Sequence, residues 1–308
     1  MNRGLKKIIT AVSFIAILNI IGCNNDMYNS NNSLNSGAET EQSIIGEYDY
    51  LENYCKKYGI KLHEFKDRNK ILKSLEKLNS DKNMLYLEMD SHLFSKDNYK
   101  ITNSETNIIY CGEIKDNKPH GIGAIYQIID GQNFIKYAGN FKKGEFEGYG
   151  MLFNIPTDEE YYYSTTIYED KEDSIKRSNF LTFEGNFKDG QPNGEGNYYE
   201  YCDLQTEMYM VQDGYDKSKD INIYIGDFEV NEDGLTGKGK MYSNGYLLYD
   251  GEYKESNYDG KGTLYFENSQ QVQYEGKFKN GQYNGKGTLY DEDGNKVYSG
   301  KWNMGDYK

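Results

Sequence analysis

Several residue types are scarce in this chain, and each scarcity argues against a class of structure or chemistry. The 308 residues include only 3 prolines, 1 tryptophan, 3 histidines and 4 cysteines. Cys55, Cys111 and Cys202 lie far apart, so they predict neither a disulfide framework nor the grouped ligands of a tetrahedral metal site. We interpret these three as incidental thiols, and we expect the protein to hold no metal and no cofactor.

Residues suited to acid–base catalysis are also few. His63 and His92 belong to no paired motif, and His120 stands directly before a predicted turn. The chain has no HExxH, GxSxG or phosphate-binding loop. Residues 158–160 could join another acid in a hydrolase-like pair, and residues 291–295 resemble a calcium loop without its terminal glutamate. Because acids are common throughout and residues 291–295 stand where a hairpin must bend, we expect a non-enzymatic protein.

Positive charge is in deficit. The chain has 35 Lys and Arg against 49 Asp and Glu, a formal net charge of −14. Contacts with nucleic-acid phosphates need a basic face, and so does broad docking on anionic lipid headgroups. The balance therefore argues against a nucleic-acid partner and against direct lipid contact by the folded part. It remains compatible with cations or basic partners.

Tyrosine and glycine, by contrast, are abundant, with 32 and 33 copies. Glycine exceeds its average usage of about 7%, and tyrosine is enriched further. Tyrosine suits a half-buried pleated surface, whereas glycine suits turns and close backbone approach. The composition predicts a sheet-rich repeat protein.

The amino terminus, residues 1–22, predicts a targeting signal. Basic residues in Met1–Lys7 precede an apolar run that, at about 14 residues, is shorter than the ~20 needed to span a bilayer. The run ends Ile-Ile-Gly-Cys23, which resembles the lipobox of bacterial lipoproteins. The resemblance implies cleavage before Cys23, diacylglycerol on its thiol and acylation of the new amino terminus. It places the protein on the extracytoplasmic face of a bacterial cell membrane; an ordinary secretory signal is the alternative.

Two segments separate this signal from the repeats. Residues 23–43 are rich in Asn and Ser and predict a flexible tether that begins at the lipidated cysteine. Residues 44–107 predict a small helical or mixed lead-in, in which residues 84–89 could be a strand or a short helix. Helical spacing relates Leu51, Tyr54, Cys55 and Tyr58, and a second stripe, Ile71, Leu72, Leu75 and Leu78, starts near Asp67 and stops at Asn79-Ser80. We expect the lead-in to cap the first repeat, with a separate binding activity as the alternative.

Residues 108–308 repeat one pattern, which is clearest in residues 274–290, YEGKFKNGQYNGKGTLY. A Tyr-x-Gly-x-aromatic run is followed by a turn dipeptide and then by Gly-x-Gly. Alternate residues of a strand share a face, and Asn-Gly suits a hairpin loop with positive φ. Each copy therefore predicts one antiparallel hairpin with rings and glycines on one face and polar residues on the other.

Six copies and a seventh half-copy start at residues 110, 137, 183, 224, 249, 274 and 298. The defining glycines are Gly112, Gly121, Gly123, Gly139, Gly148, Gly150, Gly185, Gly194, Gly196, Gly226, Gly237, Gly239, Gly251, Gly260, Gly262, Gly276, Gly285, Gly287 and Gly300. The pattern resembles the MORN family (membrane occupation and recognition nexus) from residue 110 to residue 308. This resemblance implies a mainly β fold: an elongated, curved antiparallel sheet of stacked hairpins. The longer gaps between copies predict insertions at 154–182 and 200–223, read as hairpin strands extended beyond the array edge.

Two packing predictions follow from the repeat. We expect rings from one hairpin to lie over the Gly-x-Gly gaps of the adjacent hairpin and so to fix the register. We also expect bends at the pairs Asp130-Gly131, Asp189-Gly190, Asn244-Gly245, Asn280-Gly281 and Asp293-Gly294.

An aromatic residue also recurs three positions after the second glycine of each Gly-x-Gly, with the opposite parity to the glycines. We call this row the aromatic ladder: Tyr126, Phe153, Tyr199, Tyr242, Tyr265 and Tyr290. It either packs between neighbouring hairpins or lines an exposed groove for an extended peptide or a glycan.

Taken together, these patterns favour a lipid-anchored bacterial surface protein. Its MORN array would be a non-enzymatic scaffold that contacts another protein or a second copy of itself. A glycan- or cell-wall-binding module that uses the aromatic ladder is the alternative, and a hydrolase with a carboxylate pair is the least favoured hypothesis.

Overall fold

A computed structural model describes residues 51–80, 87–88, 108–116, 118–129, 132–154, 181–201, 221–231, 233–267 and 269–307. The chain forms two compact units. Of the described residues, the N-terminal unit holds 51–53 and 64–192, and the C-terminal unit holds 54–63 and 193–307. The targeting signal, Cys23, the tether and most of both insertions lie outside the described residues, so the predictions for them remain predictions.

Both predicted helices are present in the lead-in. Residues 51–58 are helical, and α3 spans Arg68–Ser80. α3 starts directly after Asp67, whose backbone carbonyl accepts the first helical hydrogen bond, from the Ile71 N–H at 2.9 Å. Of the predicted apolar stripe, Ile71 and Leu75 are buried, and α3 packs against strands β2 and β3. Neither of these two helices is long and apolar enough to cross a bilayer.

The N-terminal unit is built on antiparallel strands that pair in chain order. They are β1 (Leu87–Glu88), β2 (Ile108–Lys115), β3 (Lys118–Ile129), β4 (Gln132–Lys142), β5 (Glu145–Phe153) and β6 (Leu181–Lys188). The ambiguous stretch 84–89 thus contributes a short strand, β1, which pairs with β2.

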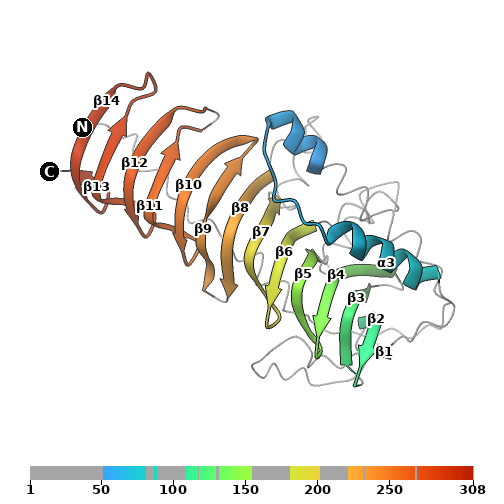
Figure 1. The fold of residues 1–308 in the computed structure, drawn as a ribbon. Helices are drawn as coiled ribbons and strands as arrows, with labels where there is room; N and C mark the ends of the chain where they lie inside the picture. Colours follow the sequence, from blue (N-terminus) through green and yellow to red (C-terminus); the bar gives the residue numbers. More distant parts are fainter. Residues whose placement is uncertain are drawn as a thin grey trace. The chain divides into compact units, whose positions relative to one another are not determined.

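The C-terminal unit continues the same arrangement, with each strand antiparallel to the next (Figure 1). Its strands are most of β7 (Gln191–Tyr201), then β8 (Ile221–Asn231), β9 (Gly234–Ser243), β10 (Tyr246–Lys254), β11 (Asn257–Tyr265), β12 (Val272–Lys279), β13 (Gln282–Tyr290), β14 (Lys296–Asn303) and β15 (Asp306–Tyr307). The predicted fold class, mainly β with stacked antiparallel hairpins and a small helical lead-in, is confirmed.

The hairpin bends are formed by the residue pairs that the sequence predicts. Asn280 and Gly281 have φ of 47° and 75°, and Asn244 and Gly245 have φ of 51° and 85°. Two consecutive positive φ values match the right-handed twist of the flanking strands. Ser256, which replaces the turn glycine, adopts φ of 61°. The Asp130-Gly131 pair lies outside the described residues.

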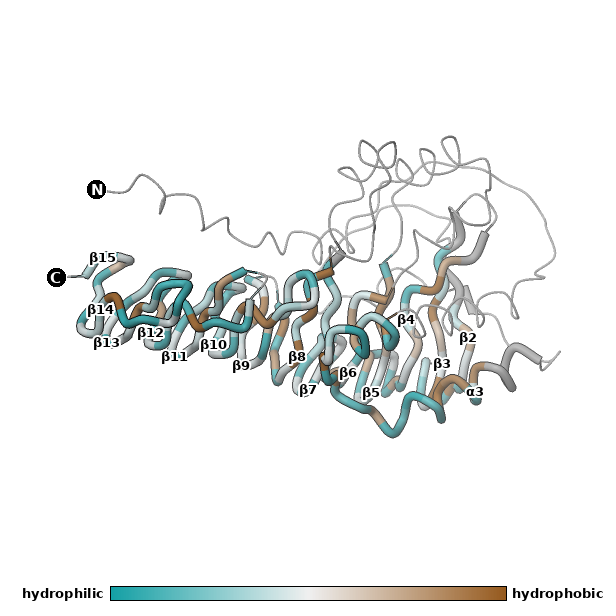
Figure 2. Tube along the Cα trace, turned by 90° about the horizontal axis from the view of Figure 1, so that it is seen from above, coloured by the Kyte–Doolittle hydropathy of each residue, from teal (hydrophilic) through white to brown (hydrophobic). Residues whose placement is uncertain are grey.

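The strand register shifts at equivalent points of most hairpins. One shift falls between the first glycine and the following aromatic residue, as between Gly276 and Phe278. A second falls directly before a ladder residue, as between Leu264 and Tyr265. β8 pairs with β7 and with β9 without either shift. In Figure 2, short hydrophobic stretches recur from strand to strand between hydrophilic turns along the C-terminal unit.

Candidate functional site

The core of each regular hairpin is a tyrosine ring that lies over glycines. A Cβ atom at Gly276 would lie 2.6 Å from both the Cα of Gly287 and the hydroxyl of Tyr274. A Cβ at Gly287 would overlap the ring of Tyr274. The covering ring therefore belongs to the same hairpin as the glycines, and the prediction that an adjacent hairpin supplies it was wrong.

A hydrogen bond explains why the ring stays on its own hairpin. The Tyr274 hydroxyl donates to the backbone carbonyl of Lys277, three residues along the same strand, at 3.1 Å. The same bond recurs, at 2.6 to 3.3 Å, from Tyr110 to Glu113, Tyr137 to Asn140, Tyr249 to Glu252 and Tyr298 to Lys301. Burial raises the pKa of Tyr274 to about 12, so its hydroxyl remains a donor at neutral pH.

The fourth copy departs from this arrangement. Tyr224 donates instead to Glu200 Oε2 at 3.3 Å, and the ring that lies against Gly226 and Gly239 belongs to Phe228. Burial raises the pKa of the Glu200 carboxyl, although hydrogen bonds from Asn222 and Tyr224 act in the opposite direction. The altered packing coincides with the absence of a register shift in this hairpin.

Sequence reasoning missed a second ring in three of the hairpins. Tyr283 of β13 stacks on Tyr274 with ring centroids 3.9 Å apart, and Tyr258 stacks on Tyr249 at 3.8 Å. Phe146 stacks on Tyr137 at 3.7 Å in the same way. The signal was available, because Phe146, Tyr258 and Tyr283 each stand two residues before the first glycine of Gly-x-Gly.

Edge-on aromatic contacts join successive hairpins. Phe278 meets Tyr249 of the preceding hairpin at 5.3 Å and 84°, and Trp302 meets Tyr274 at 5.5 Å and 85°. Such perpendicular pairs contribute roughly 0.5–1.5 kcal/mol each beyond the burial of their area. The glycine-and-ring face is therefore an internal core, which leaves the opposite face and the lead-in as candidates for function.

One core position gives a test of this packing. Tyr253 is buried, and in the described part of the chain its hydroxyl has no hydrogen-bond partner. An unsatisfied buried hydroxyl costs about 1–3 kcal/mol, so Tyr253→Phe should raise the free energy of unfolding by about 1 kcal/mol in urea denaturation. The reciprocal change at the equivalent position of the next copy, Phe278→Tyr, should lower it. Equal stability of both variants and the parent protein would contradict the packing.

The aromatic ladder divides into a buried part and an accessible part. In the N-terminal unit Tyr126 and Phe153 are 9% and 1% exposed. In the C-terminal unit Tyr199 is 3% exposed, whereas Tyr242, Tyr265 and Tyr290 are half-buried. Their cross-strand partners are Ile135, Leu181, Ile223, Leu247, Val272 and Lys296 in ladder order. The buried rings are packing residues, so only Tyr242, Tyr265 and Tyr290 remain accessible to a partner.

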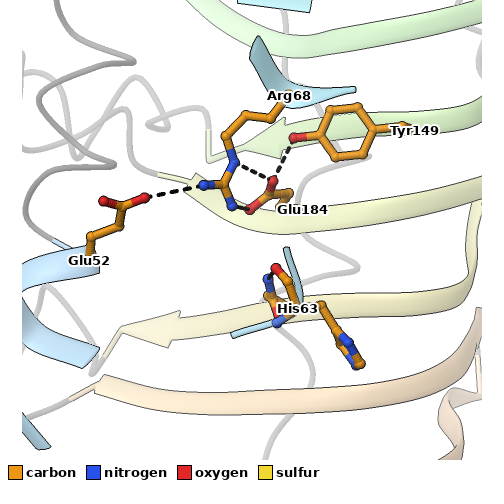
Figure 3. A network of polar contacts seen from close by, with 6 residues as sticks. Glu52, His63, Arg68, Tyr149 and Glu184 are labelled. Atoms are coloured by element: carbon orange, nitrogen blue, oxygen red, sulfur yellow. Dashed lines mark hydrogen bonds and ion pairs between the residues drawn. The ribbon is translucent and has the colours of Figure 1, made fainter. Parts of the chain in front are cut away.

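In the N-terminal unit the lead-in binds the ladder face through a polar network (Figure 3). Arg68 donates from Nε and Nη2 to the two carboxylate oxygens of Glu184, at 2.6 Å each. The Tyr149 hydroxyl also donates to Glu184, at 2.5 Å, and Glu52 accepts from Arg68 Nη1 at 3.3 Å. The Glu184 side chain is 0% exposed and that of Arg68 is 17% exposed. This bidentate pair fixes the start of α3 to β6.

In the C-terminal unit the lead-in binds the same face through backbone groups. The His63 N–H donates to Asn197 Oδ1 at 2.9 Å, and Asn197 Nδ2 donates to the His63 carbonyl at 3.0 Å. The Tyr58 ring lies against Gly245, so that a Cβ there would overlap it. Tyr58 also approaches Tyr246, with 6.4 Å between ring centroids. The lead-in therefore contacts this unit at Asn197 and at the bend between β9 and β10.

The structure supports none of the weaker chemical candidates. Asp291 accepts the backbone N–H of Asn295 at 2.7 Å and the Asn295 side-chain amide at 3.2 Å, so its carboxylate closes the predicted turn. No cluster of His, Cys, Asp and Glu in the described ranges could hold a metal ion. Burial raises the pKa of the Cys111 thiol to about 11, which keeps it protonated. Residues 158–160, His92 and Cys202 lie outside the described residues.

A shallow hollow lies in the C-terminal unit, close to Tyr58. It has a volume of about 140 Å³ and is lined by Ser243, Asn244, Tyr246, Leu247, Leu248, Phe266 and Glu267. Tyr246 is 39% exposed, and Leu247, Leu248 and Phe266 are half-buried. Glu267 is the one carboxylate in this lining, so the hollow lacks the facing acid pair that a glycoside hydrolase would need.

Comparison with known families identifies the repeat. The family model described as the MORN repeat matches residues 110–125, 137–153, 183–199, 249–271 and 274–296. The fourth copy, residues 224–242, falls between two of these segments and is also the hairpin with altered packing. No curated protein matches the chain. MORN repeats are consistent with a protein-interaction module, and their fold is typically non-enzymatic. The chain therefore contains five MORN repeats between residues 110 and 296.

Proposed function

We propose that the chain is a lipid-anchored protein of the bacterial cell surface whose MORN repeats form a non-enzymatic docking surface for another protein. The lipobox-like end of the targeting signal at Cys23 supports the anchor. The family match to five repeats supports the interaction role.

The hollow beside Tyr58 carries the proposal. Tyr246, Leu247, Leu248 and Phe266 line it with apolar surface, and Ser243, Asn244 and Glu267 add polar groups. Accessible apolar surface with a polar rim is the usual composition of a protein contact site. The lead-in already covers the adjoining surface at Gly245, which shows that this face accepts a packed helix. A second copy of the chain is the alternative partner.

Site-specific photocrosslinking in the producing cell tests both parts of the proposal. We expect a benzoylphenylalanine at position 246, which is 39% exposed, to give a discrete protein adduct in the membrane fraction. The same residue at Glu292, an exposed position in the bend at 291–295, should give none. Cys23→Ala should release the protein from the membrane fraction.

Three outcomes would contradict the proposal. Equal adducts at 246 and 292 would indicate random collision, and no adduct at 246 would remove the docking surface. Continued membrane retention of the Cys23→Ala protein would remove the lipid anchor.

A further inference from the structure

Strands β11 and β13 present the same three side chains on the accessible ladder face. Residues 260–265 and 285–290 both read Gly-Lys-Gly-Thr-Leu-Tyr. Alternation along a strand places Lys261, Thr263 and Tyr265 on one face of β11. In the same way it places Lys286, Thr288 and Tyr290 on one face of β13. Each strand therefore carries a lysine, a hydroxyl and a ring in line.

The neighbouring strands extend the lysines into a row. Lys277 of β12 stands directly opposite Lys261, and Lys301 of β14 stands directly opposite Lys286. All four are exposed, and within the described ranges none belongs to an ion pair. The stem of Lys277 lies 3.4 Å from the Cβ position of Gly285 on β13, which joins the two pairs. We call these four residues the lysine row.

The lysine row contrasts with the preceding strands of the same face. There, Lys240 of β9 stands opposite Asp250 of β10, with 3.8 Å between Nζ and Oδ2. Like charges directly opposite each other destabilise a sheet. The lysine row therefore exists at some cost to folding in a chain of net charge −14, so its positive charges point to a ligand rather than to the fold.

Hydroxyls and rings run parallel to the lysine row. Thr263 and Thr288 are half-buried, and Thr288 Oγ1 lies 2.9 Å from Ser299 Oγ. The ladder rings Tyr265 and Tyr290 lie two residues beyond the threonines and are half-buried. Glu275 stands opposite Thr263 and Thr288, and Asp250 of β10 stands opposite Thr263 on its other side. The Glu252 carboxylate lies against Gly260, next to the first lysine of the row. The surface thus offers positive charge, hydrogen-bonding groups and flat rings in adjacent lines.

The surface has a fixed period. Threonine and tyrosine recur every second strand, which is about 9.6 Å at a strand spacing of ~4.8 Å, whereas each strand from β11 to β14 carries one lysine of the row. The backbone of a polypeptide contains no flat ring that could stack on Tyr265 and Tyr290, and acidic side chains occur along it without a regular spacing. A linear polyuronate has stacking faces, hydroxyls and one carboxylate on every sugar.

We propose that this face of β11–β14 binds a linear anionic polysaccharide that carries carboxylates on its sugar rings. The lysine row pairs with the carboxylates, Thr263 and Thr288 hydrogen-bond to the hydroxyls, and Tyr265 and Tyr290 stack on the sugar faces. The site goes beyond the protein docking surface of the proposed function, because it involves none of the residues that line the hollow.

Titration of the full-length protein with oligogalacturonate tests the proposal. Lys261→Ser/Lys286→Ser should weaken binding by about tenfold or more, equivalent to ~1.4 kcal/mol. Tyr265→Leu/Tyr290→Leu should also weaken it, because leucine keeps apolar bulk and loses the flat ring. The matched control Lys254→Ser/Lys279→Ser makes the same change in net charge at exposed positions outside the row and should bind as the parent protein does. Thermal unfolding of each variant separates lost binding from lost fold.

Parallel titrations with a neutral malto-oligosaccharide, poly-L-glutamate and phosphatidylglycerol vesicles establish the ligand class. Oligogalacturonate bound far more tightly than all three would support the proposal. It would be overturned by absence of oligogalacturonate binding, by equal binding of poly-L-glutamate or vesicles, or by Tyr→Leu variants that bind normally. Photocrosslinking at position 246 is unaffected by any of these results, so the proposed function and this site can fail independently.

Discussion

Replacing Arg68 by alanine is expected to lower the free energy of unfolding by about 3–5 kcal/mol, the usual cost of breaking a buried ion pair. The Glu184 carboxylate, 0% exposed, would lose both 2.6 Å bonds from the guanidinium and, among the described residues, keep the Tyr149 hydroxyl as its one donor. A buried charge without a counter-charge is the origin of the loss. Urea denaturation of parent and variant proteins would measure it.

Matched variants separate this cause from simple loss of contacts. Glu52→Ala removes the outer acid, whose side chain is 61% exposed, and should cost no more than about 1 kcal/mol. Arg68→Met/Glu184→Leu removes both charges and should recover much of the loss. An Arg68→Ala protein as stable as Glu52→Ala would refute the anchoring role of the pair.

Gly276→Ala is the second change with a large expected effect, a loss of about 3 kcal/mol or more, at the upper end for overpacked cores. The new Cβ would meet the Gly287 Cα at 2.6 Å, the Tyr274 hydroxyl at 2.6 Å and the Lys286 carbonyl at 2.8 Å. Two of these atoms are backbone of the paired strand, which cannot retreat without breaking the β12–β13 ladder. Tyr274 is held by stacking on Tyr283.

The control for this change is Glu275→Ala, on the same strand but exposed, for which we expect a change within about 0.5 kcal/mol. Tyr274→Leu should be destabilising alone, yet combining it with Gly276→Ala should cost less than the sum, because the two groups compete for the same space. Strict additivity of the two losses would show that the ring and the glycine do not share a contact.

The repeat itself was predictable from sequence because each of its positions obeys a local rule. Asn280-Gly281 predicted a turn with positive φ, and the structure has one. Ile71 and Leu75 predicted the buried stripe of a helix, which α3 confirms. These features depend on residues close together in the chain, so spacing alone reveals them.

The parts that sequence did not predict depend on long-range contacts or on backbone detail. Glu184 occupies the same repeat position as the exposed Glu275, and its contacts with the distant Arg68 and Tyr149 distinguish the two. The covering rings were predicted to come from the adjacent hairpin, which was wrong. The register shift at Gly276 and the hydrogen bond from the Tyr274 hydroxyl to Lys277 keep each ring on its own hairpin, and neither feature can be read from residue spacing. Which rings of the aromatic ladder are buried and which are accessible likewise depends on how far the lead-in extends over the ladder.

The self-covering hairpin also determines how the molecule can be lengthened. Tyr274 packs over Gly276 and Gly287 of its own hairpin. Most of the aromatic packing is therefore internal to a hairpin, and the aromatic contacts with the neighbouring hairpin are edge-on pairs such as that between Phe278 and Tyr249. Duplication of the β12–β13 hairpin would therefore add two lysines of the row, one threonine and one tyrosine to the accessible face without a new core. Copy number thus sets the valency of that face, and avidity for a polymer can be adjusted by gene duplication alone.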